Sequence, residues 1–362
     1  MSSADTASVK TLKNWVGGEW VASTSTDILD VPNPSNGSIV SRVAMSTREE
    51  TAAAIANAAE TFKTWSKTSV TKRAKILFKL EQLLERDKDE LGTIITAENG
   101  KPHNEAVAEV GRGIENVMHA ASIPNLMMGD SLSTVATDVE VTNYRYPIGV
   151  TAAICPVHFP MMVPFWMVPM AIACGNTMVL KPSEKTPNLM NKIVDLTIEA
   201  GLPAGVLNVV QGGPDVVNEL LENPTVKSIS FVGSEGVGRY VYEHGTANFK
   251  RVQCLTGAKN HSIVLADADL DVAVDSIWQS RIGNSGQICN CAERVYVERP
   301  IHDAFVTKLK SKFEATKFGN PADDDTLDYG PLINEGALKS VSAVVDKAVE
   351  QGATVVCGSQ DG

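Results

Sequence analysis

The chain has 362 residues, with 32 basic and 43 acidic side chains that give a formal net charge of −11. This length suggests about two domains and allows a hydrophobic core that needs no disulfide support. The acidic balance argues against binding of nucleic acid through overall charge, and a hydrophobic content of 43% excludes wholesale disorder.

The amino-terminal half begins with short strands and continues with helices. Apolar runs in residues 14–43 alternate with turn signals such as NPSNG, which predicts strands joined by turns. A capping box at Ser46–Glu49 predicts the start of a helix, and apolar residues recur at helical spacing as far as Trp65. Further helices are expected over residues 70–86, 88–100 and 104–121.

From residue 140 onwards, runs rich in β-branched residues alternate with helical segments. This rhythm is typical of a parallel sheet with helices on both faces, so we predict a doubly wound α/β fold. The expected strands are 140–148, 149–155, 177–182, 207–212, 228–233 and 261–267, and the expected helices include 187–200 and 214–222. A helix and a strand are expected within residues 336–362.

Residues 146–180 contain no Asp, Glu, Lys or Arg, as in a membrane span. Five prolines interrupt them, and prolines that dense break a helix repeatedly. We therefore expect a buried strand, a loop and a short helix in a core, and no membrane segment. The amino terminus has no apolar core of the kind that a signal peptide needs.

The six cysteines are scattered, and neither a CxxC pair nor a cluster of metal-ligating residues accompanies them. A disulfide framework and a metal site are therefore not expected. We expect a reducing, cytoplasmic compartment.

Two motifs are compatible with nucleotide binding. SFVGSEGVG (230–238) places glycines between a strand and a helix, where backbone can approach a phosphate at a helix N-terminus. Its spacing is not GxGxxG, so a tight strand-to-helix turn is an equal alternative. Lys181 and Glu184 follow a predicted buried strand and can hydrogen-bond ribose hydroxyls, although an ordinary solvated charge pair is the alternative.

A third motif, NSGQICNC (284–291), places Cys289 after a small polar turn. A cysteine is a nucleophile only as its thiolate, which requires a helix N-terminus or a nearby cation. The alternative is that Cys289 is a small buried apolar residue.

Taken in order with AGLPAGVLNVVQG and LTGAKNH, these motifs resemble the aldehyde dehydrogenase superfamily over essentially the whole chain. Residues 11–265 are most similar to the CoA-acylating methylmalonate/malonate semialdehyde dehydrogenases, on stretches such as EVGRGIENV and ATDVEVTNYRYPIGV. From about residue 280, GQICNCAERVYV and KFGNPADDD resemble the lactaldehyde/glycolaldehyde branch instead.

The resemblance implies an aldehyde dehydrogenase fold. It divides the chain into a doubly wound NAD-binding domain (1–131 and 151–256), an oligomerisation arm (132–150) and a catalytic domain (257–362). Family members continue for roughly another domain, so the catalytic domain is expected to be incomplete and the chain truncated. Family members form homo-oligomers, which implies a second copy as a partner.

The resemblance also implies a mechanism. The thiolate of Cys289 attacks an aldehyde, hydride passes to NAD, and water or CoA releases the acyl group from the resulting thioester. Glu184 beside the ribose would repel a 2′-phosphate, which favours NAD over NADP. By motif match, the cofactor-binding residues are Lys181, Pro182, Glu184, Gly212, Gly233 and Ser234.

The chain departs from the family at the general base. Hydrolytic members carry a glutamate where this chain has Leu255, and a general base is typically worth about 10²–10⁴-fold in rate. A thiol with a pKa of about 8.5 is slightly ionised at neutral pH without such help. Leu255 therefore favours CoA over water as the acyl acceptor.

Two further departures concern the substrate. His158 replaces the asparagine that donates to the oxyanion; its ring N–H can donate instead, or it merely fills the space and catalysis is impaired. Ile288 replaces an arginine of the semialdehyde branch, whereas Arg112 matches that branch's other carboxylate-binding arginine. Arg112 can also be an ordinary helix-surface charge. Phe159 is assigned to substrate binding with Arg112.

We therefore predict an NAD-dependent aldehyde dehydrogenase that acts on malonate or methylmalonate semialdehyde, with CoA as the acyl acceptor. One alternative, based on Ile288, is a non-acylating enzyme of lactaldehyde type that releases a carboxylic acid. Another, based on His158 and the expected truncation, is a catalytically impaired nucleotide-binding remnant.

Overall fold

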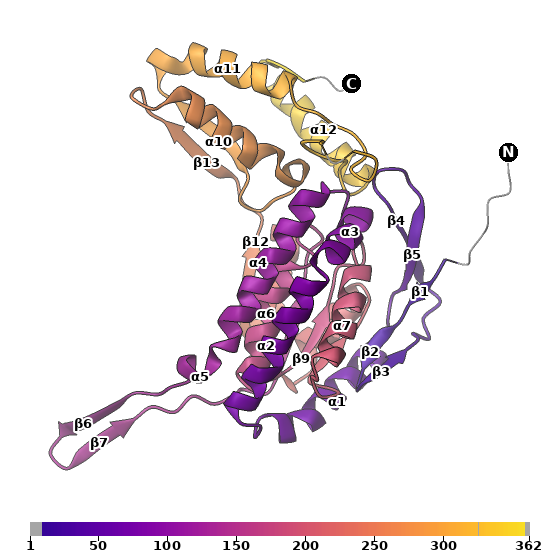
Figure 1. Cartoon of the computed structure of the whole chain (residues 1–362), viewed down its shortest axis with the longest axis vertical. Helices are drawn as coiled ribbons and strands as arrows, with labels where there is room; N and C mark the ends of the chain where they lie inside the picture. Colours follow the sequence, from indigo (N-terminus) through magenta and orange to yellow (C-terminus); the bar gives the residue numbers. More distant parts are fainter. Residues whose placement is uncertain (1–8, 325, 359–362) are drawn as a thin grey trace. The chain divides into compact units, whose positions relative to one another are not determined.

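The computed structural model describes residues 9–324 and 326–358 (Figure 1). The contacts of the chain divide it into two units. The first unit holds the described residues up to Val31, together with Ile39–Ile94 and Val107–Thr256. The second unit holds Pro32–Ser38, Ile95–Ala106 and the described residues from Gly257 onwards.

A seven-stranded sheet forms the centre of the first unit, in the order β12-β11-β8-β9-β10-β2-β3. Strands β8 to β12 pair in parallel, and β2 runs antiparallel to β10. The strands are β2 (Asn14–Val16), β3 (Glu19–Val21), β8 (Val150–Ile154), β9 (Thr177–Lys181), β10 (Leu207–Val209), β11 (Val226–Gly233) and β12 (Arg251–Thr256). A smaller sheet has the order β1 (Thr11–Leu12), β5 (Ile39–Ala44) and β4 (Ile28–Pro32).

The direction of the chain reverses in the middle of this sheet. It runs outward from β8 through β9 to β10, and then returns to β11, which pairs with the other side of β8. Right-handed crossovers place the helices of the outward and return paths on opposite faces. The outward helices are α6 (Met162–Ala173) and α7 (Asn188–Glu199), and the return helices are α8 (Pro214–Glu222) and α9 (Glu235–Ala247).

The apolar core on the return face confirms the predicted doubly wound arrangement. Ile55 of α1 (Arg48–Trp65), Leu220 of α8 and Val241 of α9 pack in one buried cluster with Ile154 and Ile229 of the sheet. The helices predicted between residues 70 and 121 are also confirmed. They are α2 (Val70–Arg86), α3 (Lys88–Asn99) and α4 (His103–Ala121), and a short α5 (Ile123–Leu126) follows.

The predicted capping box lies one residue too early. The N-cap of α1 is Thr47, whose hydroxyl accepts the Glu50 N–H, while the Glu50 carboxylate accepts the Thr47 N–H at 3.0 Å. Ser46, the residue before it, is not the cap, and its hydroxyl instead accepts a buried hydrogen bond from the amide of Asn14 at 2.8 Å.

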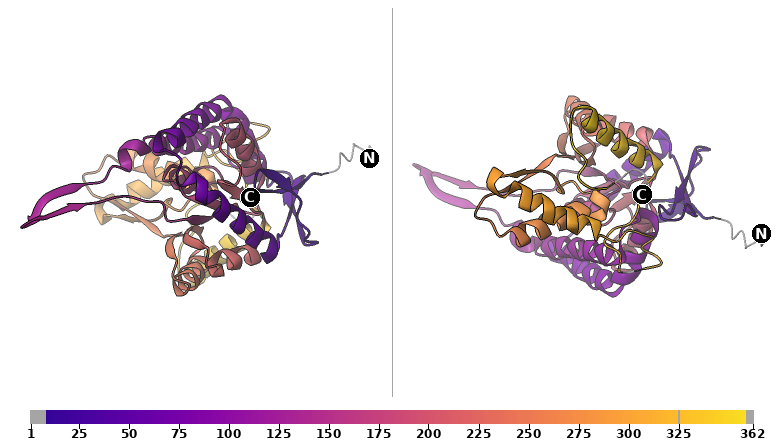
Figure 2. Two further views of the ribbon diagram at one scale, coloured as in Figure 1. Left: turned by 90° about the horizontal axis from the view of Figure 1, so that it is seen from below. Right: turned by 90° about the horizontal axis from the view of Figure 1, so that it is seen from above.

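The uncharged stretch contains the buried strand β8, a loop and the helix α6, as predicted. Among the described residues, no helix is both long and apolar enough to cross a bilayer. The strand predicted over residues 140–148 is wrong in its extent, because β7 (Val139–Thr142) ends at Thr142. With β6 (Ser131–Ala136), β7 forms a two-stranded hairpin whose residues are all exposed and which projects from the first unit (Figure 2).

The second unit is built around two parallel strands, β13 (Asn260–Val264) and β14 (Ala292–Val297). The helices α10 (Leu270–Ile282) and α11 (His302–Glu314) bury Val274, Ile277 and Phe305 against Val264. The helix α12 (Glu335–Glu350) matches the predicted helix near the carboxyl terminus. The strand predicted after it is not present in residues 353–358, where the backbone pairs with no other strand.

Candidate active site

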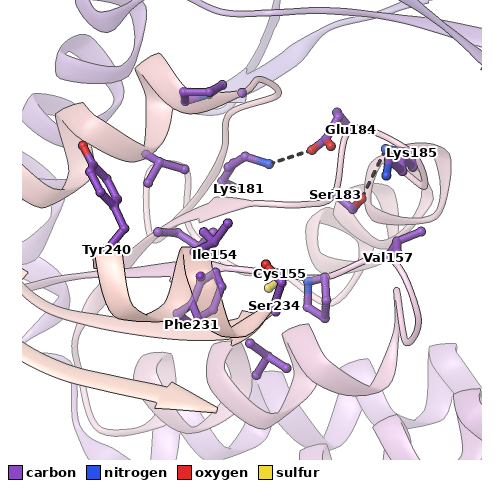
Figure 3. Close-up of a pocket in the computed structure, with 18 of the residues that line it drawn as sticks. Ile154, Cys155, Val157, Lys181, Ser183, Glu184, Lys185, Phe231, Ser234 and Tyr240 are labelled. Carbon is purple, nitrogen blue, oxygen red and sulfur yellow. Dashed lines mark hydrogen bonds and ion pairs between the residues drawn. The ribbon is translucent and has the colours of Figure 1, made fainter. Parts of the chain in front are cut away.

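A cavity of 580 Å³ opens at the carboxyl ends of β8, β9 and β11 (Figure 3). Strands β8 and β11 are the point where the chain reverses its direction across the sheet. Doubly wound sheets bind ligands at this position because the loops that leave adjacent strands diverge there. The cavity is also lined by residues of α8 and α9, and its volume suits a small-molecule ligand.

One wall of the cavity carries an ion pair between Lys181 and Glu184. The Nζ atom of Lys181 lies 3.2 Å from a Glu184 carboxylate oxygen and donates to the Pro182 carbonyl at 2.8 Å. Because Lys181 is only 5% exposed, the pair is not an ordinary solvated one. Burial raises the pKa of Glu184, but Lys181 and hydrogen bonds outweigh it, so the pKa lies below its usual value.

The opposite wall is the amino terminus of α9. Ser234 is the N-cap of this 13-residue helix, and its side chain makes no capping hydrogen bond. The first backbone N–H groups of a helix favour an anion, so this end suits a pyrophosphate. The ionised Glu184 can accept hydrogen bonds from ribose hydroxyls, so the two walls together fit the ribose and the pyrophosphate of a dinucleotide.

Two of the predicted cofactor-site glycines keep the backbone close to its neighbours. An added Cβ at Gly233 would lie 2.5 Å from the ring of Phe231, which also lines the cavity. At Gly212, which has a φ of +152°, it would lie 2.5 Å from Val216. Gly233 lines the cavity itself, whereas Pro182 and Gly212 adjoin lining residues in the chain.

The cavity is also lined by residues that were not predicted from the sequence, among them Tyr240, Asn218 and Cys155. Tyr240 of α9 donates through its hydroxyl to Asn218 of α8 at 2.7 Å, so it joins the two helices beside the cavity. Burial raises the pKa of Cys155 to about 12, although Lys181 opposes this, so its thiol is neutral. No local pattern marks Tyr240 and Asn218, because they meet only when α8 and α9 lie side by side.

The predicted nucleophile lies in the second unit, after a strained turn. Asn284, Ser285 and Gly286 all have φ between +44° and +76°, a left-handed conformation that costs energy in non-glycine residues. Ser285 donates to the Gly330 carbonyl at 2.6 Å, which helps to hold the turn. Cys289 follows and is half-buried.

The neighbouring thiol has a different environment. Cys291 is 1% exposed, and a guanidinium nitrogen of Arg281 lies 3.2 Å from its sulfur. Cys289 is therefore the more accessible of the two thiols, as its predicted role requires.

The predicted substrate residues lie in the first unit. His158 is half-buried, Phe159 is buried, and their ring centroids are 5.0 Å apart. Glu109 of α4 accepts hydrogen bonds from the backbone N–H groups of Met161 and Met162 at 2.8 Å and 3.1 Å. The carboxylate therefore anchors the beginning of α6, directly after the His158–Phe159 segment. Arg112 lies on α4, almost one turn after Glu109, and is exposed.

The chain matches the sequence model of the aldehyde dehydrogenase family over residues 20–362. It belongs to that family. Its relatives include the malonate-semialdehyde dehydrogenase of Bacillus subtilis (strain 168), which is 52% identical over 355 residues, or 98% of this chain and 73% of the relative.

Two solved structures have the same fold as this aldehyde dehydrogenase. The methylmalonate-semialdehyde dehydrogenase of Oceanimonas doudoroffii has a TM-score of 0.94 at 38% identity, covering 96% of this chain and 71% of the other. The second is a protein of Sinorhizobium meliloti 1021 that is assigned the same activity and is complexed with NAD. It has a TM-score of 0.95 at 34% identity, covering 98% of this chain and 72% of the other.

Family membership decides the class of reaction. This aldehyde dehydrogenase catalyses the NAD-dependent oxidation of an aldehyde, and the fold predicted from the order of the motifs is confirmed.

Proposed function

We propose that this aldehyde dehydrogenase oxidises malonate or methylmalonate semialdehyde and transfers the acyl group to CoA. Similarity to a malonate-semialdehyde dehydrogenase over 98% of the chain supports the substrate. The observation that carries the acyl acceptor is Leu255, an aliphatic residue where hydrolytic members have a glutamate. The exposed guanidinium of Arg112 supports a carboxylated aldehyde, because two parallel hydrogen bonds can hold a carboxylate.

Cys289 is the proposed nucleophile. Its thiolate sulfur forms a bond to the aldehyde carbon, and the carbonyl electron pair moves onto the oxygen to give a thiohemiacetal oxyanion. When the oxyanion collapses, the carbon loses its hydrogen as hydride and becomes a thioester. NAD accepts that hydride when bound.

His158 is proposed to stabilise the oxyanion. A neutral imidazole has one N–H that can donate to the developing negative charge, as the asparagine amide of other family members does. Glu109 supports this role because its hydrogen bonds to Met161 and Met162 fix the backbone directly after His158 and Phe159.

The cavity of the first unit is proposed to hold NAD. Glu184 would accept hydrogen bonds from ribose hydroxyls, Lys181 would keep Glu184 ionised, and the amino terminus of α9 at Ser234 would face the pyrophosphate. The negative charge of Glu184 disfavours the 2′-phosphate of NADP.

The proposed acceptor step needs no general base from the protein. The CoA thiolate forms a bond to the thioester carbon, and the bond to Cys289 breaks to return its thiolate. A water molecule would have to lose a proton during its attack, and Leu255 cannot accept one.

The test measures NADH formed from each semialdehyde and NAD, with and without CoA. We expect sustained turnover only with CoA, and about one NADH per chain without it. Leu255→Glu should restore CoA-independent turnover, and Leu255→Gln, which has no base, is the matched control. Equal turnover with and without CoA would contradict the proposed acceptor, and NADH release without an acylated Cys289 would contradict the nucleophile.

The alternative is a lactaldehyde-type dehydrogenase, which Ile288 favours because it cannot bind a carboxylate. A kcat/KM for lactaldehyde above that for both semialdehydes, independent of CoA, would support it. NAD binding with no acylated Cys289 from any of these aldehydes would support the impaired remnant.

The β6–β7 hairpin is proposed to pair with a second copy of the chain. Isolated two-stranded hairpins are at best marginally stable in water, and this one exposes Leu132, Val135 and Val141. Val135→Lys together with Val141→Lys should reduce the mass measured by light scattering to that of a monomer. An unchanged mass of the oligomer, or a monomeric wild type, would refute this role.

The six free thiols are consistent with the proposed reducing, cytoplasmic compartment.

A further inference from the structure

The segment that carries Cys289 is joined to β13 by an irregular strand pairing. Asn260 pairs with Ala292 of β14, but the next residue, His261, pairs with Arg294. Glu293 of β14 therefore has no paired residue on β13. Such an extra residue in one strand is a β-bulge. Bulges re-aim a side chain and are frequent beside active sites.

At this bulge the side chain of Asn260 bonds to the nucleophile segment. Its amide nitrogen donates to the carbonyl oxygen of Cys289 at 2.8 Å and to that of Cys291 at 3.1 Å. An asparagine amide nitrogen has two hydrogens, enough for both bonds. The two carbonyls stand on either side of Asn290, so one side chain holds the backbone at and beyond the nucleophile.

Other contacts hold this segment on either side of Cys289, among them a hydrogen bond from the Ile333 N–H to the side chain of Gln287 at 3.0 Å. Ser285 bonds to the Gly330 carbonyl before Cys289, and the Ala292 N–H donates to the Ser280 hydroxyl after it. Among the hydrogen bonds of the described residues, only the one from Asn260 reaches the Cys289 carbonyl from outside the segment.

We propose that Asn260 is a positioning residue for the nucleophile. The two hydrogen bonds fix the peptide that carries Cys289, so that its sulfur is held in the orientation needed for attack on the aldehyde carbon. This inference rests on the proposed role of Cys289. Misplacing a reacting atom by about 1 Å can cost about 10²-fold in rate, so loss of these hydrogen bonds should slow chemistry without affecting NAD binding.

Asn260→Asp is the sharpest variant, because it keeps the size of the side chain, removes both donors and places a negative charge against two carbonyl oxygens. Asn260→Ala removes the donors without adding charge. Asn320→Ala is the matched control, since that amide donates to Asp323 in an exposed turn of the same unit.

Hydrogen–deuterium exchange tests whether Asn260 holds the backbone around Cys289, and it needs no turnover. In both Asn260 variants, the amides of residues 287–291 should exchange at least tenfold faster than in the wild type. Peptides from α10 and α11 should be unchanged, and Asn320→Ala should leave residues 287–291 as they are. Unchanged exchange in residues 287–291 would overturn the proposal, and so would an equal increase throughout the second unit, which would indicate a purely structural role.

Single-turnover NADH formation without CoA tests the consequence for chemistry. The variants should form NADH at least tenfold more slowly, with an undiminished amount of NADH per folded chain and an NAD dissociation constant within twofold of the wild type. A reduced amount at an unchanged rate would overturn the positioning role. If the wild type forms no acyl-enzyme, the proposed function fails, whereas the exchange experiment still decides whether Asn260 holds the segment.

Discussion

Replacing Glu184 with glutamine tests whether the cavity at the reversal of the sheet is the cofactor site. The substitution keeps the shape of the side chain and removes its charge. In the wild type, burial raises the pKa of Glu184, but the opposing effects of Lys181 and of hydrogen bonds keep it below its ordinary value. The site therefore offers a full carboxylate at neutral pH.

The expected loss of affinity follows from the hydrogen bond that this carboxylate can accept. A hydrogen bond to a charged group contributes about 1.5–3 kcal/mol, and about 1.4 kcal/mol corresponds to a tenfold change in affinity. Glu184→Gln should therefore weaken NAD binding by about 10- to 100-fold. NADP should lose less, because the substitution also removes the repulsion of its 2′-phosphate.

Calorimetric titration of both cofactors measures these changes. The matched control is Glu60→Gln, which neutralises an exposed carboxylate that is paired with Lys63 on α1. The control should leave both dissociation constants within twofold of the wild type. A folded Glu184→Gln protein that binds NAD with wild-type affinity would refute the assignment of this cavity to the cofactor.

The same ion pair predicts a pH dependence of stability. Because the pKa of Glu184 is lower in the folded chain than its ordinary value of 4.5, the pair stabilises the folded state at higher pH. This contribution is complete above the unfolded-state pKa and is lost as the pH falls through the lower folded-state pKa. Urea unfolding between pH 7 and pH 3 should show a smaller loss of stability in Glu184→Gln than in the wild type, and equal losses would contradict it.

Three further substitutions or reactions have defined outcomes. Gly212→Ala should lower the free energy of unfolding by about 1–3 kcal/mol, measured with urea, since the new Cβ would meet Val216 at 2.5 Å; an unchanged midpoint would argue against this crowding. Ile288→Arg should raise kcat/KM for malonate semialdehyde relative to propanal by about tenfold, because a charged hydrogen bond to the carboxylate is gained; no change in this ratio would count against binding of the carboxylate there. Iodoacetamide at pH 8 should label Cys289 at least tenfold faster than Cys155, whose buried thiol has a pKa of about 12, and equal labelling by peptide mass spectrometry would disprove the contrast.

The accuracy of the sequence-based predictions depended on whether the deciding interactions were local. The helices α2 and α4 were predicted closely because their apolar residues recur at 3.6-residue spacing, a property of each segment alone. The start of α1 was misplaced by one residue: Thr47 is the N-cap, and the hydroxyl of Ser46 accepts a hydrogen bond from the distant Asn14. The strand at 140–148 was overextended because alternation of polar and apolar residues does not reveal where a pairing strand ends.

The candidate site shows the same division. Lys181, Glu184 and Ser234 were predicted because each follows a strand within a recognisable local motif, and the structure places all three around one cavity. Tyr240 and Asn218 were not predicted, since their hydrogen bond forms only when α8 and α9 lie together. The spacing of residues along the chain does not predict a contact between two separate helices.

The sequence by itself determined the alternation of strands and helices, the family and the identity of the candidate nucleophile, because each is a matter of residue type and short-range order. The tertiary structure decided that β11, the strand after β10 along the chain, returns to pair with β8, and so where the cavity opens. It also decided that Asn260 reaches the carbonyls of Cys289 and Cys291, because that contact forms only when β13 pairs with β14, a strand almost thirty residues further along the chain. Pairing between distant strands depends on the whole fold, which no local pattern specifies.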